Sequence, residues 1–248
     1  MSSGPDLETT IGDIVLGDRD VFPPYLYAAY RSTLLRAPKQ PLIAIPLTIS
    51  ELTGPGPAFS EVVPEDADLT RNAGTGGEAI GQRIIVTGRV TDEYGAAVPE
   101  TLIEVWQANA AGRYLHRADA WPAPLDPSFL GMGRSLTDAD GSYRFLSVRP
   151  GAYPWGNHPN AWRPSHIHFS LFGDSLLSRL ITQMYFPDDP LHELDPILSA
   201  VPEAARSRLI AEYDHSITEP QWALGYRFDI VLRGPQATPF EPPRRMES

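Results

Sequence analysis

Cysteine is absent from the sequence. Disulfide bonds, iron–sulfur clusters and thiolate zinc sites are therefore excluded, both as stabilising elements and as reactive centres. Any metal ion that the protein binds has to be held by histidine, tyrosine, aspartate or glutamate.

An excess of positive charge is absent too. The chain has 20 lysines and arginines against 31 aspartates and glutamates, a formal net charge of -11 at pH 7. Nucleic-acid binding needs a basic face that displaces counterions, so this balance argues against a nucleic-acid partner. A small anionic substrate is compatible with the charge only if local cations offset the overall field.

Long apolar runs are missing as well, and no stretch approaches the roughly 20 residues of a membrane span. The first residues, MSSGPDLETT, contain neither the basic segment nor the apolar segment of a secretory signal. We therefore expect no membrane partner and a cytoplasmic location.

Proline and glycine are abundant, at 26 and 20 residues, which predicts short strands joined by long loops. Composition divides the chain into an extended N-terminal arm (1–78), a catalytic core (79–234) and a C-terminal tail (235–248). The arm has little periodicity, apart from one or two helical turns predicted within 25–35 that Pro38 ends. We expect such an arm to lie on its own core or on a partner chain.

Runs of β-branched and aromatic residues predict the strands of the core. The runs are RIIVTGRVTDEYG (83–95), TLIEVWQANAAG (101–112), TDADGSYRF (137–145), HIHFSLF (166–172), RLITQMYF (179–186) and YRFDIVL (226–232). A helix is predicted over 202–214, because Pro202 and Glu203 suit a first turn and an apolar side follows. The predicted fold class is all-β: an antiparallel, immunoglobulin-like β-sandwich with long loops and a short helix in its C-terminal half.

The segment TDADG (137–141) resembles the opening of a calcium loop. Such a loop needs a glutamate at its twelfth position, and Arg149 stands there when the count starts at Asp138. The segment therefore predicts a hairpin turn instead.

His166 and His168 are two residues apart in a predicted strand, so both imidazoles project from one face and can converge on one ion. The alternative is one structural and one incidental histidine. The preceding segment, GAYPWGNHPNAWRPS (151–165), suits either a rigid pocket for a planar ligand or a well-packed surface loop. No carboxylate lies near in sequence to complete a ferrous site, whereas Tyr114 and Tyr153 are candidates for an anionic set that favours ferric iron.

Eight motifs follow one another nearly continuously over residues 79–234. They are GQRIIVTGRV, EVWQANAAGRY, APLDPSF, TDADGSYRF, RPGAYPW, WRPSHIHF, LITQMYF and YRFDIVLRG. This series resembles the intradiol ring-cleaving dioxygenases, and within them the iron-binding chain of the members that act on protocatechuate. ISELTGPG (49–56) extends the likeness into the arm. The resemblance implies a non-haem Fe(III) cofactor with four ligands: Tyr114, Tyr153, His166 and His168.

Further roles are implied by the same resemblance. Arg163 and Gln183 match residues around the pocket and, with the displaceable ligand Tyr153, are the expected catalytic residues. Arg163 is expected to stabilise negative charge on the substrate ring. Its structural alternative, packing on a neighbouring tryptophan, is compatible with that role.

The substrate-binding residues implied are Arg163, the aromatic wall Trp155, and Tyr30, which matches a tyrosine that contacts the substrate carboxylate. Tyr30 aligns through the motif RAPKQ (36–40). The sequence departs from related chains after YPW, where they commonly carry arginine and this chain has Gly156. A cation that helps to hold the carboxylate is therefore missing, and His158 is a possible substitute.

The activity implied is cleavage of protocatechuate by O2 to 3-carboxy-cis,cis-muconate, a step in aromatic catabolism through the β-ketoadipate pathway. The implied partner is a homologous α-type chain without the iron ligands, which would cover the arm and an apolar loop around Trp155 and Trp162. One alternative is a catechol or hydroxyquinol 1,2-dioxygenase, whose helical N-terminal domain residues 1–78 do not suggest. The others are a non-enzymatic β-sandwich binding module and a self-sufficient homodimer.

Overall fold

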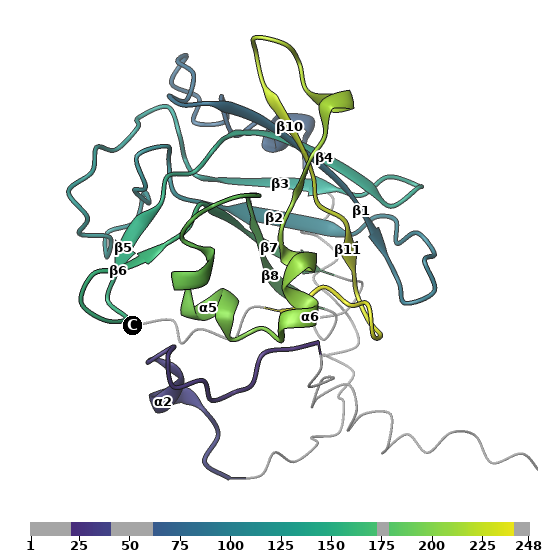
Figure 1. Ribbon diagram of the computed structural model, residues 1–248. Helices are drawn as coiled ribbons and strands as arrows, with labels where there is room; N and C mark the ends of the chain where they lie inside the picture. Colours follow the sequence, from purple (N-terminus) through teal and green to yellow (C-terminus); the bar gives the residue numbers. More distant parts are fainter. Residues whose placement is uncertain (1–20, 41–61, 173–178, 241–248) are drawn as a thin grey trace, which may run out of the picture.

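Two β-sheets face each other in the computed structural model, which describes residues 21–40, 62–172 and 179–240 (Figure 1). The first sheet consists of β1 (Arg83–Thr91), β4 (Ser142–Val148), β9 (Glu212–Tyr213), β10 (Leu224–Arg227) and β11 (Ile230–Val231). The second has the order β3 (Met132–Leu136), β2 (Leu102–Trp106), β7 (His166–Phe172), β8 (Arg179–Tyr185). A separate hairpin pairs β5 (Tyr153–Trp155) with β6 (Ala161–Arg163). The predicted all-β sandwich is confirmed.

Most strand pairs are antiparallel, but β1 runs parallel to both β10 and β11. The antiparallel sandwich expected from the sequence thus also contains two parallel pairs. A tight turn imposes an antiparallel pairing only on the two strands that it joins, whereas most of the core separates β1 from β10. The turn predicted at 138–141 forms, and Asp138 Oδ1 accepts from Ser142 N at 2.9 Å. It joins β3 to β4, which belong to different sheets, so it does not make the predicted hairpin.

Side chains from both sheets fill the space between them. The buried cluster includes Ile84 and Val86 of β1, Phe145 of β4, Ile103 and Val105 of β2, Ile167, Phe169 and Leu171 of β7, and Met184 of β8. Alternation along β7 sends three residues into this core and leaves His166, His168 and Ser170 on the opposite face, which is also buried. The second sheet therefore has a covered outer face.

The short helices α5 (Pro196–Ser199) and α6 (Glu203–Arg206) lie beside β7 and β8 (Figure 1). They bring Leu198, Val201, Ala205 and Leu209 against Tyr185 in a second, smaller apolar cluster. This cluster covers the outer face of β8 at Tyr185, next to β7, where His166 and His168 are buried.

The helix predicted over 202–214 is wrong beyond its first turns. Helix α6 ends at Arg206, a 3-10 turn η3 (Ser207–Leu209) follows, and Glu212–Tyr213 form β9. Ala211 N donates to Tyr185 O at 2.8 Å, and β9 pairs with β10. Pairing with existing strands outweighs helix propensity, because propensity differences are only a few tenths of a kcal/mol per residue, roughly up to 0.7.

The described parts of the N-terminal segment lie on the chain's own sandwich. The predicted helical turn is α2 (Thr33–Arg36), shorter and later than expected. Arg31 N donates to Asn157 Oδ1, and Asn157 Nδ2 donates to Ala29 O, both at 2.8 Å. Leu69 is fully buried in the core. The division of the chain at 78 and 234 stays a prediction.

Parts of these expectations lie outside the described residues: the motif ISELTGPG (49–56) and the end of the tail, 241–248. In the part of the chain that the structure does describe, no helix has both the length and the apolar character needed to cross a membrane.

Tyr143 provides a test of the sandwich. Its hydroxyl donates to Phe228 O at 2.5 Å, and burial raises the pKa of Tyr143 well above its usual range, which keeps it a neutral donor. Tyr143→Phe leaves this buried carbonyl without that donor, so we expect the free energy of unfolding to fall by about 1–2 kcal/mol. Urea denaturation measures the change. Tyr94→Phe, at a position that is 87% exposed, is the matched control and should cost nothing; equal costs would contradict the assignment.

Candidate functional site

The two histidines lie in the middle of the second sheet. In its hydrogen-bonded register, His166 is opposite Tyr185, and His168 is flanked by Gln183 and Trp106. His166 Nδ1 is 2.6 Å from Pro164 O. Because a carbonyl only accepts hydrogen bonds, Nδ1 carries the proton and Nε2 presents a lone pair. That nitrogen lies 3.3 Å from the Tyr153 hydroxyl.

The two tyrosines complete a continuous set of ring contacts. The rings of Tyr114 and Tyr153 have centroids 5.4 Å apart at 85°, and those of Tyr153 and His166 are 5.6 Å apart. The His166 and His168 rings are 4.9 Å apart. The structure therefore gathers the four predicted ligands in one place, although they come from a loop, β5 and β7.

Two glycines let the tyrosine-bearing segments touch backbone to backbone. Gly112 has φ +78°, and a Cβ there would lie 2.3 Å from Ala152 O. A Cβ on Gly151 would lie 2.6 Å from Ala110 O, and Gly151 N donates to Asn109 O at 2.9 Å. Any side chain at either position would push apart the segments that carry Tyr114 and Tyr153.

Hydrogen bonds between residues close in sequence shape the loop that carries Tyr114. Asn109 Oδ1 accepts from Arg113 N at 3.0 Å, and Asp119 Oδ2 accepts from Tyr114 N at 2.8 Å. Asp119 Oδ1 also accepts from Trp121 N at 2.9 Å. These are local turn-forming interactions of Asn and Asp side chains, and they direct Tyr114 back toward β5.

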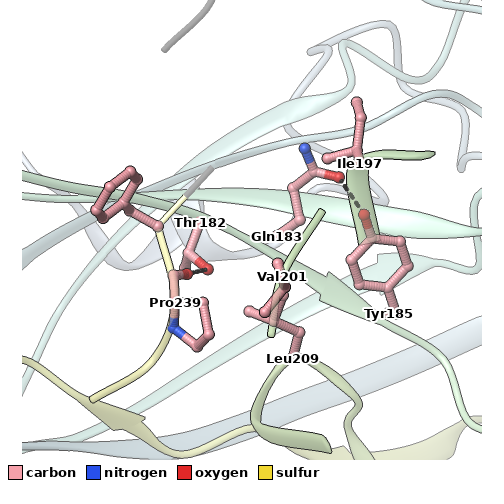
Figure 2. A pocket seen from close by; sticks show the side chains of 8 residues that line it. Thr182, Gln183, Tyr185, Ile197, Val201, Leu209 and Pro239 are labelled. Carbon is pink, nitrogen blue, oxygen red and sulfur yellow. Dashed lines mark hydrogen bonds between the residues drawn. The ribbon is translucent and has the colours of Figure 1, made fainter. Parts of the chain in front are cut away.

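Arg163 lies at the centre of a buried polar network. Its side chain is fully buried and pairs with Asp195, with Nε 3.2 Å from Oδ2. Nη2 donates to Gln183 Oε1, and it lies 3.2 Å from the Tyr185 hydroxyl. Figure 2 shows Gln183 and Tyr185 joined by a hydrogen bond, beside Ile197. The Gln183 side-chain nitrogen has no hydrogen-bond partner among the described residues.

Aromatic side chains form a wall next to Arg163. The Arg163 guanidinium carbon lies 5.5 Å from the Trp155 ring centroid, and the Tyr30 and Trp155 rings are 5.6 Å apart. Trp155 and Trp162 are both half-buried, so the expectation that their loop exposes a large apolar surface is wrong. Among the described residues of the arm, the exposed apolar side chains include Leu26, Leu34 and Leu35.

Gly156 lies on the exposed rim of this region. A Cβ added there would meet no atom within 4 Å. His158 is exposed, and its Nδ1 is 2.8 Å from Pro159 O. It lines an open surface depression with Arg31 and Glu193, among other residues. Arg31 therefore supplies a positive group in this depression, together with the carboxylate of Glu193, while position 156 itself carries no charge.

The donor set fits a ferric ion. Within residues 21–40, 62–172 and 179–240, no three His, Cys, Asp or Glu side chains gather as a metal site would require. The further side chains that lie against the histidine pair and can donate to a metal are the phenols of Tyr153 and, next to it, Tyr114. Two phenolates and two imidazoles form a hard, anionic set, and the Pro164 carbonyl orients His166 as carbonyls commonly orient metal-binding histidines.

Three residues of the site were not anticipated from the sequence. Trp106 stacks on His168, with centroids 4.8 Å apart and an interplanar angle of 1°. Tyr185 follows Gln183 by two residues, so strand alternation was a usable signal for it. Asp195 has no such signal, because its place in the network depends on how α5 packs.

Comparison with known proteins agrees with this geometry. A family model described as "Dioxygenase" matches residues 55–234, and one described as "Protocatechuate 3,4-dioxygenase beta subunit N terminal" matches residues 16–48. The protocatechuate 3,4-dioxygenase beta chain of Burkholderia cepacia is 58% identical over 219 residues, covering 88% of this chain and 93% of that protein. The alpha chain from Pseudomonas putida is 30% identical, covering 81% and 98%.

Solved structures support the fold. 3-Chlorocatechol 1,2-dioxygenase from Rhodococcus opacus 1CP has a TM-score of 0.51 at 22% identity, covering 78% of this chain and 71% of that one. Hydroxyquinol 1,2-dioxygenase from Pseudomonas putida DLL-E4 has a TM-score of 0.51 at 20% identity, covering 97% and 78%. With the family model spanning most of the chain and a relative 58% identical over nearly all of it, the chain belongs to the intradiol ring-cleaving dioxygenases.

Proposed function

We propose that the chain is the iron-binding subunit of an enzyme that cleaves protocatechuate with O2, between its two hydroxyl-bearing carbons, to 3-carboxy-cis,cis-muconate. The observation that carries this proposal is the convergence of Tyr114, Tyr153, His166 and His168. It is found in a chain 58% identical to a protocatechuate 3,4-dioxygenase beta chain. Ferric iron, when bound, draws electron density from a bound catechol and makes its ring reactive toward O2.

Tyr153 is proposed as a base as well as a ligand. Its hydroxyl faces His166 Nε2 at 3.3 Å. As a phenolate, Tyr153 would be able to accept a proton from a substrate hydroxyl. Deprotonated substrate is the form that reacts.

Arg163 and Gln183 are proposed to act on the substrate ring. Arg163 is fully buried and paired with Asp195, so it stabilises negative charge on the ring through the N–H groups of its guanidinium, a contribution of about 3 kcal/mol. Gln183 Nε2, buried and without a hydrogen-bond partner among the described residues, is placed to donate to substrate or to an ordered water. Trp155 and Tyr30 form the wall against which a planar ring packs.

A homologous α-type chain is the proposed partner. Two alpha chains of protocatechuate 3,4-dioxygenases are 30% identical to this chain. The arm exposes Leu26, Leu34 and Leu35, which are 56%, 53% and 89% accessible, and covering such side chains is favourable in an assembly. We propose that the α-type chain covers them, rather than a second copy of this chain.

Catechol is the second candidate substrate. The observation in its favour is Gly156, which leaves the rim without the cation that a carboxylate-bearing substrate uses. The non-enzymatic binding module is excluded, because the chain belongs to an enzyme family.

Product analysis tests the proposed reaction. The chain, loaded with iron and produced with and without the α-type partner, is mixed with protocatechuate under ¹⁸O2. We expect 3-carboxy-cis,cis-muconate that carries two labelled oxygen atoms, formed faster with the partner present. A yellow extradiol semialdehyde as main product, or catechol cleaved in preference to protocatechuate, would contradict the proposal.

Ligand substitutions test the metal site. His166→Ala and His168→Ala should each weaken iron binding by more than about 100-fold, since even residues that only orient ligands cost 10- to 100-fold. Tyr114→Phe and Tyr153→Phe should shift or weaken the visible phenolate–iron band. His215→Ala, at an exposed histidine of another turn, is the control and should keep both iron and colour. Stoichiometric iron with an unchanged spectrum in either His166 or His168 variant would refute the ligand set.

Gly156→Arg tests carboxylate recognition. Open space around position 156 accommodates the side chain, and a cation near a carboxylate contributes about 1 kcal/mol at a partly solvated rim. We expect the KM for protocatechuate to fall about fivefold, with the KM for catechol unchanged. Gly156→Ala serves as the control without charge. Equal changes for both substrates would show that this position does not distinguish them.

A further inference from the structure

Asp195 places a carboxylate against Arg163 in the interior. Both side chains are fully buried, and Arg163 Nε lies 3.2 Å from Asp195 Oδ2. The Tyr185 hydroxyl lies 3.0 Å from the same oxygen, and Ile197 N donates to Asp195 Oδ1 at 3.1 Å. Both carboxylate oxygens are therefore hydrogen-bonded, as a buried charge requires.

Stability alone does not account for this ion pair. Removing two charges from water offsets most of their attraction, and apolar side chains of similar size commonly stabilise a protein as well or better. The residues that follow Asp195 in α5, among them Ile197 and Leu198, are buried and apolar, so the ion pair lies in surroundings that an apolar pair of side chains would also suit. What a carboxylate adds is a fixed orientation for the group that it binds.

The group that it fixes is the guanidinium of Arg163. Asp195 holds Nε, while Gln183 and Tyr185, both neutral, hold Nη2 on the same edge. A guanidinium is planar and rigid, so two held nitrogens define the direction of the whole group. That plane lies over Trp155, with the guanidinium carbon 5.5 Å from the ring centroid.

Helix α5 determines where Asp195 lies. Asp195 is the N-cap residue, its side chain accepts from Ile197 N, and Pro196 occupies the first helical position. Leu198 packs against Tyr185 in the smaller apolar cluster. The carboxylate is thus placed by the packing of α5 on β8, from outside the pocket.

We propose that Asp195 is a positioning residue for ring cleavage, which holds the Arg163 guanidinium in the orientation that stabilises negative charge on the substrate. This inference rests on the proposed function. Asp195 acts through Arg163 and does not itself contact the substrate. Its removal should therefore lower kcat much more than it raises KM, and only while Arg163 is present.

A double-mutant cycle tests this dependence. The iron-loaded complex with the α-type chain is prepared as wild type, Asp195→Asn, Arg163→Gln and the double variant, and kcat and KM for protocatechuate are measured. We expect Asp195→Asn to lower kcat about tenfold and to change KM less than about twofold. In the Arg163→Gln background the same substitution should change kcat less than about twofold.

Asp214 offers a matched control. It is the N-cap of η4 (His215–Ile217), accepts from Ser216 N at 2.8 Å and pairs with Arg227. It therefore repeats the cap and ion-pair contacts of Asp195 at a turn where the arginine is exposed. Asp214→Asn should leave kcat unchanged in both backgrounds, which separates loss of a helix cap from loss of Arg163 orientation.

Two results would overturn the role of Asp195: an unchanged kcat in Asp195→Asn, or an equal loss of kcat in both backgrounds. If Asp195→Asn does not fold, Asp195→Glu replaces it, and its smaller loss should again vanish without Arg163. Absence of ring-cleaved product from the wild type would count against the proposed function instead. In that case, the dissociation constant of 4-hydroxybenzoate, which is protocatechuate without one hydroxyl, is measured for the same four variants. Asp195 and Arg163 are coupled if the effect of Asp195→Asn on this constant depends on Arg163.

Discussion

Burial of β7 on both faces is the constraint on which the rest of the structure depends. One face supplies Ile167, Phe169 and Leu171 to the core between the sheets, and the other carries His166 and His168. Imidazoles can be buried only if their polar atoms are satisfied, so this outer face needs specific neighbours rather than a general apolar cover. Tyr153 of the hairpin β5–β6, Trp106 of β2 and Tyr185 of β8 provide those neighbours, and helices α5 and α6 pack on Tyr185. Together these elements cover the outer face of the second sheet and surround the site.

The charges of the site follow from the same enclosure. A chain with a net charge of -11 repels an anionic substrate at long range, so attraction has to come from local cations. Arg163 supplies guanidinium N–H donors in the interior, but Asp195 offsets its charge there. Burying such a pair costs desolvation energy. What the pair supplies in return is a fixed orientation of the Arg163 guanidinium. At the rim of the site, position 156 contributes no charged group, because it is a glycine with open space around it.

Local sequence patterns predicted most strands because their signal is local. Alternating β-branched and aromatic residues define 83–91, 166–172 and 179–185 whatever they pair with. The same reasoning failed for 202–214, where an edge of the sheet captures the chain at Ala211 and β9. It failed again for the parallel β1–β10 pair. Both depend on contacts between residues far apart in the chain, which no short window contains.

For the site, strand alternation alone requires that His166 and His168 share a face. The ligand roles of Tyr114 and Tyr153 came from family resemblance, since neither tyrosine has a fixed spacing to the histidine pair. The close approach of the two tyrosine-bearing segments at Gly112 and Gly151, and the contact of Asp195 with Arg163, follow from packing between distant segments. The reason is physical: strand geometry fixes the direction of neighbouring side chains, whereas contacts between separate segments depend on how whole elements pack.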